Sequence, residues 1–212
     1  MTTDMVLRHP SRSLAPLRLY GKRIMLRPLA PNDFRSWSEV RQRNGEWLTV
    51  WEPSRQAHQP DPTTDRSAFS SRCLQRDRDR AAGTAYQFGI FVDQQIAGEV
   101  NLNNVIRGAM QSCTVGYWID QAHAGNGYTA EGVVLVLQFA FEQLGLHRVE
   151  ICIVPRNHRS RRIVEKLGIR DEGTAQRYLE INGEWEDHIR YGITSEEWTT
   201  RRSELVSAWI SG

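Results

Sequence analysis

A glycine-rich turn that leads into an apolar helix constrains this chain more than any other feature. The segment His123-Ala-Gly-Asn-Gly-Tyr-Thr-Ala-Glu131 directly precedes the apolar run Gly132–Leu144. Glycines at the mouth of a helix let the backbone turn tightly and approach a ligand, and the free N–H groups and the helix dipole favour an anion there. We therefore expect the turn to hold a phosphate group through the backbone of Ala124, Gly125, Asn126, Gly127, Tyr128 and Thr129; the alternative is a turn that only caps the helix.

The segments around this turn predict a βαβ unit. Thr114–Asp120 precedes it and has the composition of a strand, and Asn157-His-Arg-Ser160 opens an arginine-rich helix further on. Strand, glycine turn, helix, strand and polar helix start, in this order, fit a unit built around a phosphorylated ligand.

Composition limits the class of protein. The 212 residues suit one domain, which we place at residues 17–212, after a loose tail at residues 1–16 that lacks the apolar stretch of a signal peptide. A net charge of +2 indicates no general affinity for nucleic acid, and no apolar run is long enough to cross a membrane. The three cysteines form an odd number without metal-ligand spacing, so we expect reduced thiols, no metal and a cytoplasmic location.

Hydrophobic periodicity and turn residues predict alternating helices and strands. Asn182-Gly183 is a strong hairpin signal between the last two strands. The expected strands are Leu17–Arg27, Tyr86–Val92, Ile96–Ile106, Ser112–Asp120, Val149–Val154, Asp171–Leu179 and Glu184–Ile193. The expected helices are Pro31–Arg43, Thr64–Arg80, Gly127–Leu144, Asn157–Leu167 and one that begins at Ser195, with an aromatic loop at Trp47–Pro53.

Several of these motifs together resemble the GCN5-related N-acetyltransferases (GNAT), and in particular the RimJ/RimL type that acetylates the N-terminal amine of ribosomal proteins. The segments that carry the resemblance are Gly116–Asp120, Gly125–Gly127, Asn157–Ser160, Glu165–Gly168 and Asn182–His188, with Asn44–Pro53 and Asn104–Gly108 closest to the RimJ branch. The resemblance implies an α/β (α+β) GNAT fold, with a mixed, mostly antiparallel seven-stranded sheet flanked by helices. It also implies that acetyl-CoA lies where Ser112–Asp120 and Val149–Val154 splay apart, with Ile119 among its contacts.

Three positions depart from the usual pattern of the family. The pyrophosphate loop usually begins with Gln or Arg and ends with Gly or Ala, and Ala124 and Thr129 stand at those places. Because most of the loop's bonds come from backbone N–H groups, binding should survive this change. The tyrosine that often acts as general acid is replaced by Val164, and the nearest relatives are thought to use the serine that corresponds to Ser160.

The general base stays unassigned. Some relatives carry a glutamate on the sixth strand, but the matching residue is Leu179, and Glu180 is on the opposite face of a regular strand.

The resemblance and the residue types together suggest roles on the donor side. Asn157 can bond the pantetheine amide or cap its helix, or do both. Ser160 can donate a proton to the leaving sulfur, or its hydroxyl can simply be solvated. Arg162, in the arginine cluster, can bind a nucleotide phosphate or lie on a solvated helix face.

The acceptor side is less defined. A protein α-amine has a pKa about 2.5 units below that of lysine, so its neutral form costs roughly 3–4 kcal/mol less at pH 7, and a weak base or a water chain can suffice. Glu52, Glu99 and Asn101 are candidates to orient the amine or that water. The alternative is that they form surface salt bridges or structural hydrogen bonds. Trp47, Trp51 and Tyr117 are candidates for the wall of the acceptor groove. The alternative is that they pack in the hydrophobic core.

Three functions remain open from the sequence. The first is acetyl-CoA-dependent acetylation of the N-terminal alanine of a small-subunit ribosomal protein. The second is acetylation of a small amine such as a polyamine or an aminoglycoside, and the third is a ribosome-associated factor that binds CoA without turnover. No nucleic acid or membrane is expected as a direct partner, and the sequence leaves monomer and homodimer open.

Overall fold

The computed structural model describes residues 17–56 and 58–211, so the tail predicted at residues 1–16 lies outside the described residues. Its centre is an eight-stranded sheet in the order β1-β2-β3-β4-β5-β6-β8-β7. The strands are β1 (Leu19–Tyr20), β2 (Met25–Arg27), β3 (Tyr86–Val92), β4 (Gln95–Ile106), β5 (Ser112–Ile119), β6 (Arg148–Ile153), β7 (Arg170–Ile181) and β8 (Glu184–Thr194).

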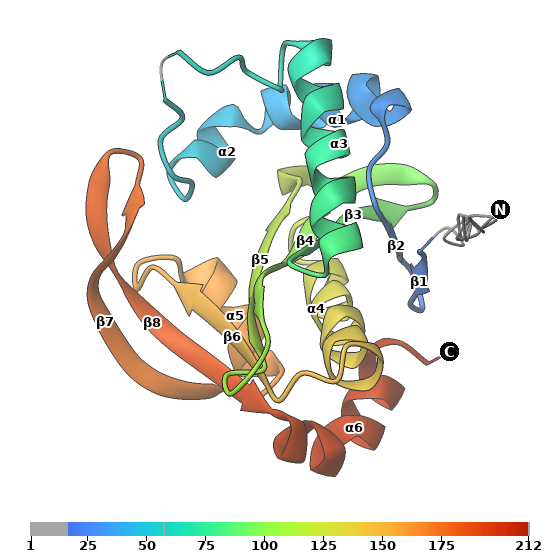
Figure 1. Ribbon diagram of the computed structural model, residues 1–212, viewed down its shortest axis with the longest axis vertical. Coiled ribbons are helices and arrows are strands. Elements are labelled where there is room, and N and C mark those ends of the chain that lie inside the picture. The colour runs from blue at the N-terminus through green and yellow to red at the C-terminus, as the bar shows by residue number, and fades with distance from the viewer. Residues whose placement is uncertain (1–16, 57, 212) are drawn as a thin grey trace, which may run out of the picture.

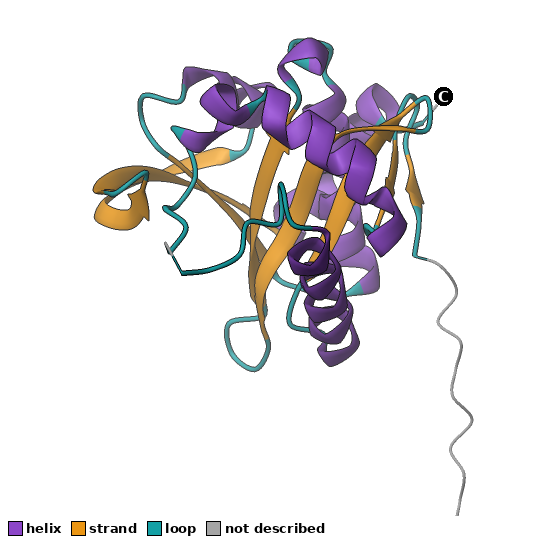
Figure 2. Ribbon diagram, turned by 90° about the horizontal axis from the view of Figure 1, so that it is seen from above, coloured by secondary structure: helices purple, strands orange, loops and turns teal. Residues whose placement is uncertain are grey.

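The helices cover both faces of this sheet (Figure 2). They are α1 (Phe34–Arg43), α2 (Gly45–Thr49), α3 (Arg66–Ala82), α4 (Tyr128–Gln138), α5 (His158–Lys166) and α6 (Ser195–Trp209). Three short turns complete the elements: η1 (Pro31–Asp33), η2 (Gln121–His123) and the π-helical η3 (Phe139–Gln143). No helix in the described part of the chain is long and apolar enough to span a bilayer.

The mixed, mostly antiparallel sheet expected from the sequence is confirmed, but the predicted strand count of seven is wrong. Residues 17–27, expected to form one strand, form the β1–β2 hairpin, in which the N–H of Gly21 donates to the carbonyl of Ile24 at 2.9 Å. The segment predicted as an aromatic loop also differs, because its first residues form the short helix α2.

Two hydrophobic clusters lie on opposite faces of the sheet. Strand alternation sends Val100 and Leu102 of β4 into the larger cluster, which contains the almost wholly buried helix α4. Trp37 of α1 and Phe69 of α3 belong to the smaller cluster on the other face. Helices α1 and α3 therefore cover one face, and α4 covers the other.

The central strands separate along half of their length. β5 and β6 are parallel and pair only at Ser112–Arg148, Cys113–Val149 and Thr114–Glu150 within the described residues. Beyond Thr114, β5 continues beside β4, whereas β6 continues beside β8. The splay expected between these two strands is confirmed, and the long β7–β8 hairpin curves away on its far side (Figure 1).

Candidate active site

A cleft of about 410 Å³ lies where β5 and β6 separate. Asn157 and Ser160, from the start of α5, line it together with Tyr117 of β5. The β7–β8 hairpin contributes Tyr178, Leu179, Ile181 and His188, and the rest of the lining comprises Trp51, Pro53, Asn103, Asn104, Thr114, Val115, Gly116, Ile151, Cys152, Ile153 and Val154.

The glycine turn forms the start of α4 as expected. Gly125 and Gly127 both have φ of 84°, a left-handed conformation that costs a residue with a side chain about 1–2 kcal/mol. Gly127 is the N-cap and makes no side-chain capping bond, so the N–H groups of the first turn point outward toward a potential ligand. Thr129 is buried below them, whereas Gly125 and Asn126 are exposed.

Arg23, which the sequence analysis did not select, supports this turn from the β1–β2 hairpin. Its guanidinium donates to the carbonyl of Asn126 at 2.8 Å and lies 5.0 Å from the ring centroid of Tyr128. The fully buried carboxylate of Glu131 accepts bonds from the backbone and the side chain of Arg23 at 2.8 and 3.0 Å. The hairpin therefore places an ion pair beside the helix N-terminus, with the guanidinium of Arg23 on its exposed side. No local pattern could have indicated this, because the two partners are 108 residues apart.

Asn157 and Ser160 are held by the N-cap of α5. The Oδ1 atom of Asn157 accepts the N–H of Ser160 at 3.1 Å, which leaves the amide Nδ2 of Asn157 for another partner. The hydroxyl of Ser160 donates to the hydroxyl of Tyr117 at 2.9 Å, and Tyr117 donates to the carbonyl of Ser160 at 3.1 Å. Burial raises the pKa of Tyr117, so its phenol stays protonated. Tyr117 therefore lines the cleft beside Ser160, to which it is hydrogen-bonded.

Trp47 of α2 and Trp51, which follows it, both contact arginines at the start of α5, but only Trp51 reaches the cleft. Trp51 lines the cleft, and the guanidinium of Arg156 lies 4.6 Å from its ring. The indole N–H of Trp47 donates to the carbonyl of Ile119 at 3.2 Å, and the guanidinium of Arg159 lies 4.3 Å from the ring centroid of Trp47. Trp47 therefore fixes the end of β5 and is not part of the cleft lining.

Arg162 and Ala124 occupy the outer part of the predicted cofactor surface. Arg162 is exposed on α5, and Ala124 is half-buried at the start of the glycine turn. Their side chains are not part of the cleft lining.

Glu99 lies in the buried layer under α3, on the sheet face that α1 also covers. Its fully buried carboxylate contacts the guanidinium groups of Arg72 at 3.0 Å and Arg76 at 2.7 Å, and accepts the indole N–H of Trp37 at 2.6 Å. Burial alone would raise the pKa of Glu99, but the two arginines and Trp37 outweigh it and lower the pKa to about 2. A carboxylate bound in this way does not reach the cleft and is a poor base.

Glu52 and Asn101 are also outside the cleft lining. The carboxylate of Glu52 is bound by the guanidinium of Arg41 at 2.7 and 2.6 Å, and its backbone carbonyl accepts the N–H of Asn182 at 2.9 Å. The Oδ1 atom of Asn101 is buried without a hydrogen-bond partner among the described residues, opposite Gln87 in the neighbouring strand. Glu52 thus joins the stretch after α2 to the β7–β8 turn, and Asn101 pairs with Gly116 of β5, which lines the cleft.

The strand alternation predicted for Leu179 and Glu180 is confirmed. Leu179 lines the cleft, whereas the carboxylate of Glu180 bonds the backbone N–H groups of Gly183 and Ser54 in the β7–β8 turn. No glutamate or aspartate belongs to the cleft lining in the part of the chain that the structure describes.

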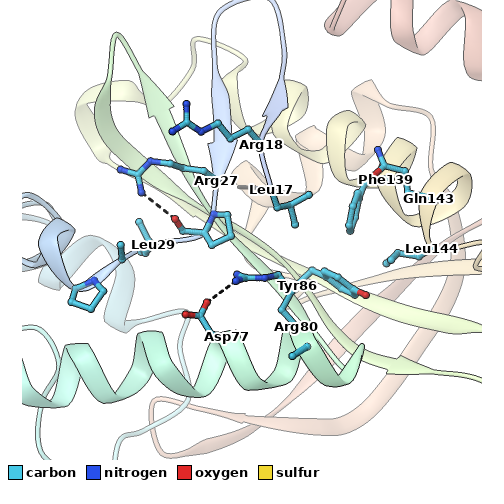
Figure 3. A pocket seen from close by; sticks show the side chains of 14 residues that line it. Leu17, Arg18, Arg27, Leu29, Asp77, Arg80, Tyr86, Phe139, Gln143 and Leu144 are labelled. Carbon is cyan, nitrogen blue, oxygen red and sulfur yellow. Dashed lines mark hydrogen bonds and ion pairs between the residues drawn. The ribbon is translucent and has the colours of Figure 1, made fainter. Parts of the chain in front are cut away.

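A second pocket, of about 580 Å³, lies apart from this cleft beside β2 and the end of α3 (Figure 3). Its charged side chains are largely satisfied by partners, because Arg27 binds Asp33 at 2.7 Å and Arg80 binds Asp77 at 2.9 Å. Tyr86 and Phe139 form part of its apolar wall.

The fold and the cleft together define an acyltransferase of the GNAT class. Residues 23–170 match the family model described as "Acetyltransferase (GNAT) domain", and the chain belongs to this family. It is 36% identical over 172 residues to the "Probable N-acetyltransferase YjcK" of Bacillus subtilis (strain 168), which covers 80% of this chain and 93% of that protein.

Two further proteins are similar to this chain over most of its length. The "[Ribosomal protein uS5]-alanine N-acetyltransferase" of Escherichia coli (strain K12) is 30% identical over 194 residues, which is 90% of this chain and 98% of that protein. The solved structure "Mycobacterium smegmatis RimJ in complex with CoA-disulfide" superposes with a TM-score of 0.81 at 30% identity and covers 92% of both chains.

Proposed function

We propose that this enzyme transfers the acetyl group of acetyl-CoA to the α-amine of a protein N-terminus, and that its acceptor is a ribosomal protein that begins with alanine. The observation that carries the proposal is the cleft between β5 and β6. Its lining combines Asn157 and Ser160 with aromatic, amide and aliphatic side chains and contains no carboxylate among the described residues. The similarity to the uS5-alanine N-acetyltransferase of Escherichia coli supports the choice of acceptor.

The donor half of the reaction follows from the site. The N–H groups at the start of α4, together with the guanidinium of Arg23, suit the pyrophosphate of CoA. The free amide of Asn157 suits a pantetheine carbonyl in the cleft. When the amine attacks the thioester carbon and the carbon–sulfur bond breaks, the cleft-lining hydroxyl of Ser160, which is bonded to Tyr117 at 2.9 Å, would donate a proton to the departing sulfur.

The acceptor half favours a weakly basic, singly charged amine. A polyamine or an aminoglycoside carries several positive charges and calls for carboxylates around it, but the described lining of the cleft contains none. An α-amine reaches its neutral form for roughly 3–4 kcal/mol less than a lysine does at pH 7. Trp51 and Tyr178 offer flat apolar surfaces on which an extended N-terminal segment can lie.

The test is a mass-spectrometric acetylation assay with acetyl-CoA and three acceptors. The first is an alanine-initiated ribosomal peptide, the second is the same peptide with a blocked N-terminus and a free internal lysine, and the third is a polyamine. We expect the mass of one acetyl group to be added to the first peptide alone.

The other results would contradict the proposal in different ways. A gain on the polyamine alone would assign the enzyme to small amines. No gain on any acceptor, with acetyl-CoA binding intact by calorimetry, would favour a binding factor without turnover.

A further inference from the structure

His188 is a buried histidine in the cleft to which the mechanism above gives no role. It lies on β8 at the end of the Asn182–His188 segment, is 3% exposed, and belongs to the cleft lining. Its Nδ1 atom is 3.0 Å from the backbone carbonyl oxygen of Glu186. Because a carbonyl oxygen can only accept a hydrogen bond, Nδ1 carries the proton, and in the neutral ring the lone pair is on Nε2.

Strand alternation places this ring on the opposite face of the sheet from Ser160. Ile189 and Tyr191 of β8 belong to the larger hydrophobic cluster, and the hydroxyl of Tyr191 accepts a bond from Arg161 of α5 at 3.3 Å. Successive side chains of a strand point to opposite faces, so His188 points away from the α5 side. Its neighbour there is Tyr178 of β7, whose ring centroid is 5.7 Å away.

The other titratable groups near the ring are poorly suited to accept a proton. Cys152 on β6 and Tyr178 on β7 line the cleft, and the pKa of each is raised, so both stay protonated at neutral pH. On β8 itself, Glu186 forms an ion pair with Arg156, and Arg190 forms one with Glu150.

We propose that Nε2 of His188 accepts the proton that the α-amine loses when it attacks the thioester, a role that rests on the function proposed above. The amine nitrogen forms a bond to the carbonyl carbon, the carbon–sulfur bond breaks, and the sulfur takes the hydroxyl proton of Ser160, which then regains a proton from solvent. The amine proton leaves to His188 and from there to solvent. The base His188 and the acid Ser160 thus act from opposite faces of the splayed sheet. The amine loses its proton on the His188 face, and the sulfur gains one on the Ser160 face.

The test compares three histidine variants with a matched control. H188N keeps a side-chain N–H close to the position of Nδ1, so the bond to the Glu186 carbonyl can persist while Nε2 is lost. H188Q replaces Nε2 by an amide that cannot take up a proton, and H188A opens space for added imidazole. The control H147N changes an exposed histidine that contacts Glu196 at 3.3 Å, outside the cleft.

We expect kcat of H188N and H188Q with the alanine-initiated peptide to fall by about 10²-fold or more, the range typical of a lost general base. The dissociation constant of acetyl-CoA should stay unchanged, and the acidic limb of the wild-type kcat–pH profile should disappear in these variants. Imidazole should restore part of the activity of H188A, and H147N should match the wild type.

A kcat within about threefold of the wild type and an unchanged pH profile in either folded variant would overturn the role of His188. The wild-type acceptor panel separates this failure from a failure of the proposed function. If the wild type acetylates only a polyamine, the α-amine proposal fails, and the same variants are then tested with that polyamine. If the wild type acetylates no acceptor, both proposals fail.

Discussion

Replacing Glu99 with glutamine tests whether this carboxylate stabilises the fold or takes part in the reaction. E99Q preserves shape and an oxygen acceptor for Trp37, but removes the negative charge between Arg72 and Arg76. Glu99 has a folded-state pKa of about 2 against an ordinary value of 4.5, a difference worth about 3 kcal/mol at neutral pH at 1.36 kcal/mol per unit. Removal of one partner from a buried ion pair costs about 3–5 kcal/mol, which agrees with this figure.

Urea denaturation at pH 7 measures the effect. With an m-value of about 2–3 kcal/mol per M, a loss of about 3 kcal/mol lowers the midpoint by about 1 M. The matched control is E39Q, which removes a carboxylate from an exposed ion pair with Arg35 and should change the midpoint very little. At a temperature where E99Q stays folded, its kcat should equal that of the wild type, because Glu99 does not line the cleft.

The dependence on pH provides a second check. The folded-state pKa of Glu99 is depressed, so its stabilising contribution is complete above the unfolded value of 4.5 and is lost as pH falls toward about 2. The wild type should therefore lose stability more steeply than E99Q between these pH values. A variant with wild-type stability but a much lower kcat would refute this assignment and restore Glu99 as a candidate base.

Three further predictions concern the donor site and the thiols. S160A should bind acetyl-CoA as the wild type does in calorimetry but lose about 10²-fold in kcat, and unchanged turnover would remove Ser160 from the mechanism. G127A should weaken CoA binding more than G125A does. Both residues have positive φ, but only at Gly127 would an added Cβ meet neighbours, namely Arg23 at 3.3 Å and Trp209 at 3.4 Å. Equal losses of CoA affinity in calorimetry would contradict this. Cys73 and Cys113 should react with a disulfide reagent at pH 8 only after unfolding, because burial raises their pKa values to about 11 and 12, and rapid labelling of the native protein would disagree.

Local patterns in the sequence predicted most elements of the fold. The left-handed glycines at Gly83 and Gly168 end α3 and α5 near the predicted positions, and the Asn182-Gly183 turn joins β7 to β8 as expected. The β1–β2 hairpin was missed because the chain reverses at Gly21, within a segment whose alternating apolar residues resemble one continuous strand.

The candidate site was predictable where its residues are neighbours in the chain. Asn157 and Ser160 share one helix turn, so their proximity followed from spacing alone. The ion pairs of Glu99 could not be predicted, because an acidic residue in an apolar strand gives no sign of Arg72 and Arg76, which approach it from a separate helix. Arg23 escaped notice for the same reason, since its partner Glu131 belongs to a distant segment.

The short β5–β6 pairing has a consequence for how the molecule unfolds. Three residue pairs are the whole strand-to-strand connection between the β1–β5 part of the described sheet and the β6–β8 part. A molecule that occupies the opening contacts both parts, and it adds binding free energy to the folded state of each at once. Ligand-free protein should therefore show lower cooperativity in unfolding and faster amide hydrogen exchange along β6 and β8. The two parts also share the larger hydrophobic cluster, so saturation with CoA should slow this exchange and raise the cooperativity further.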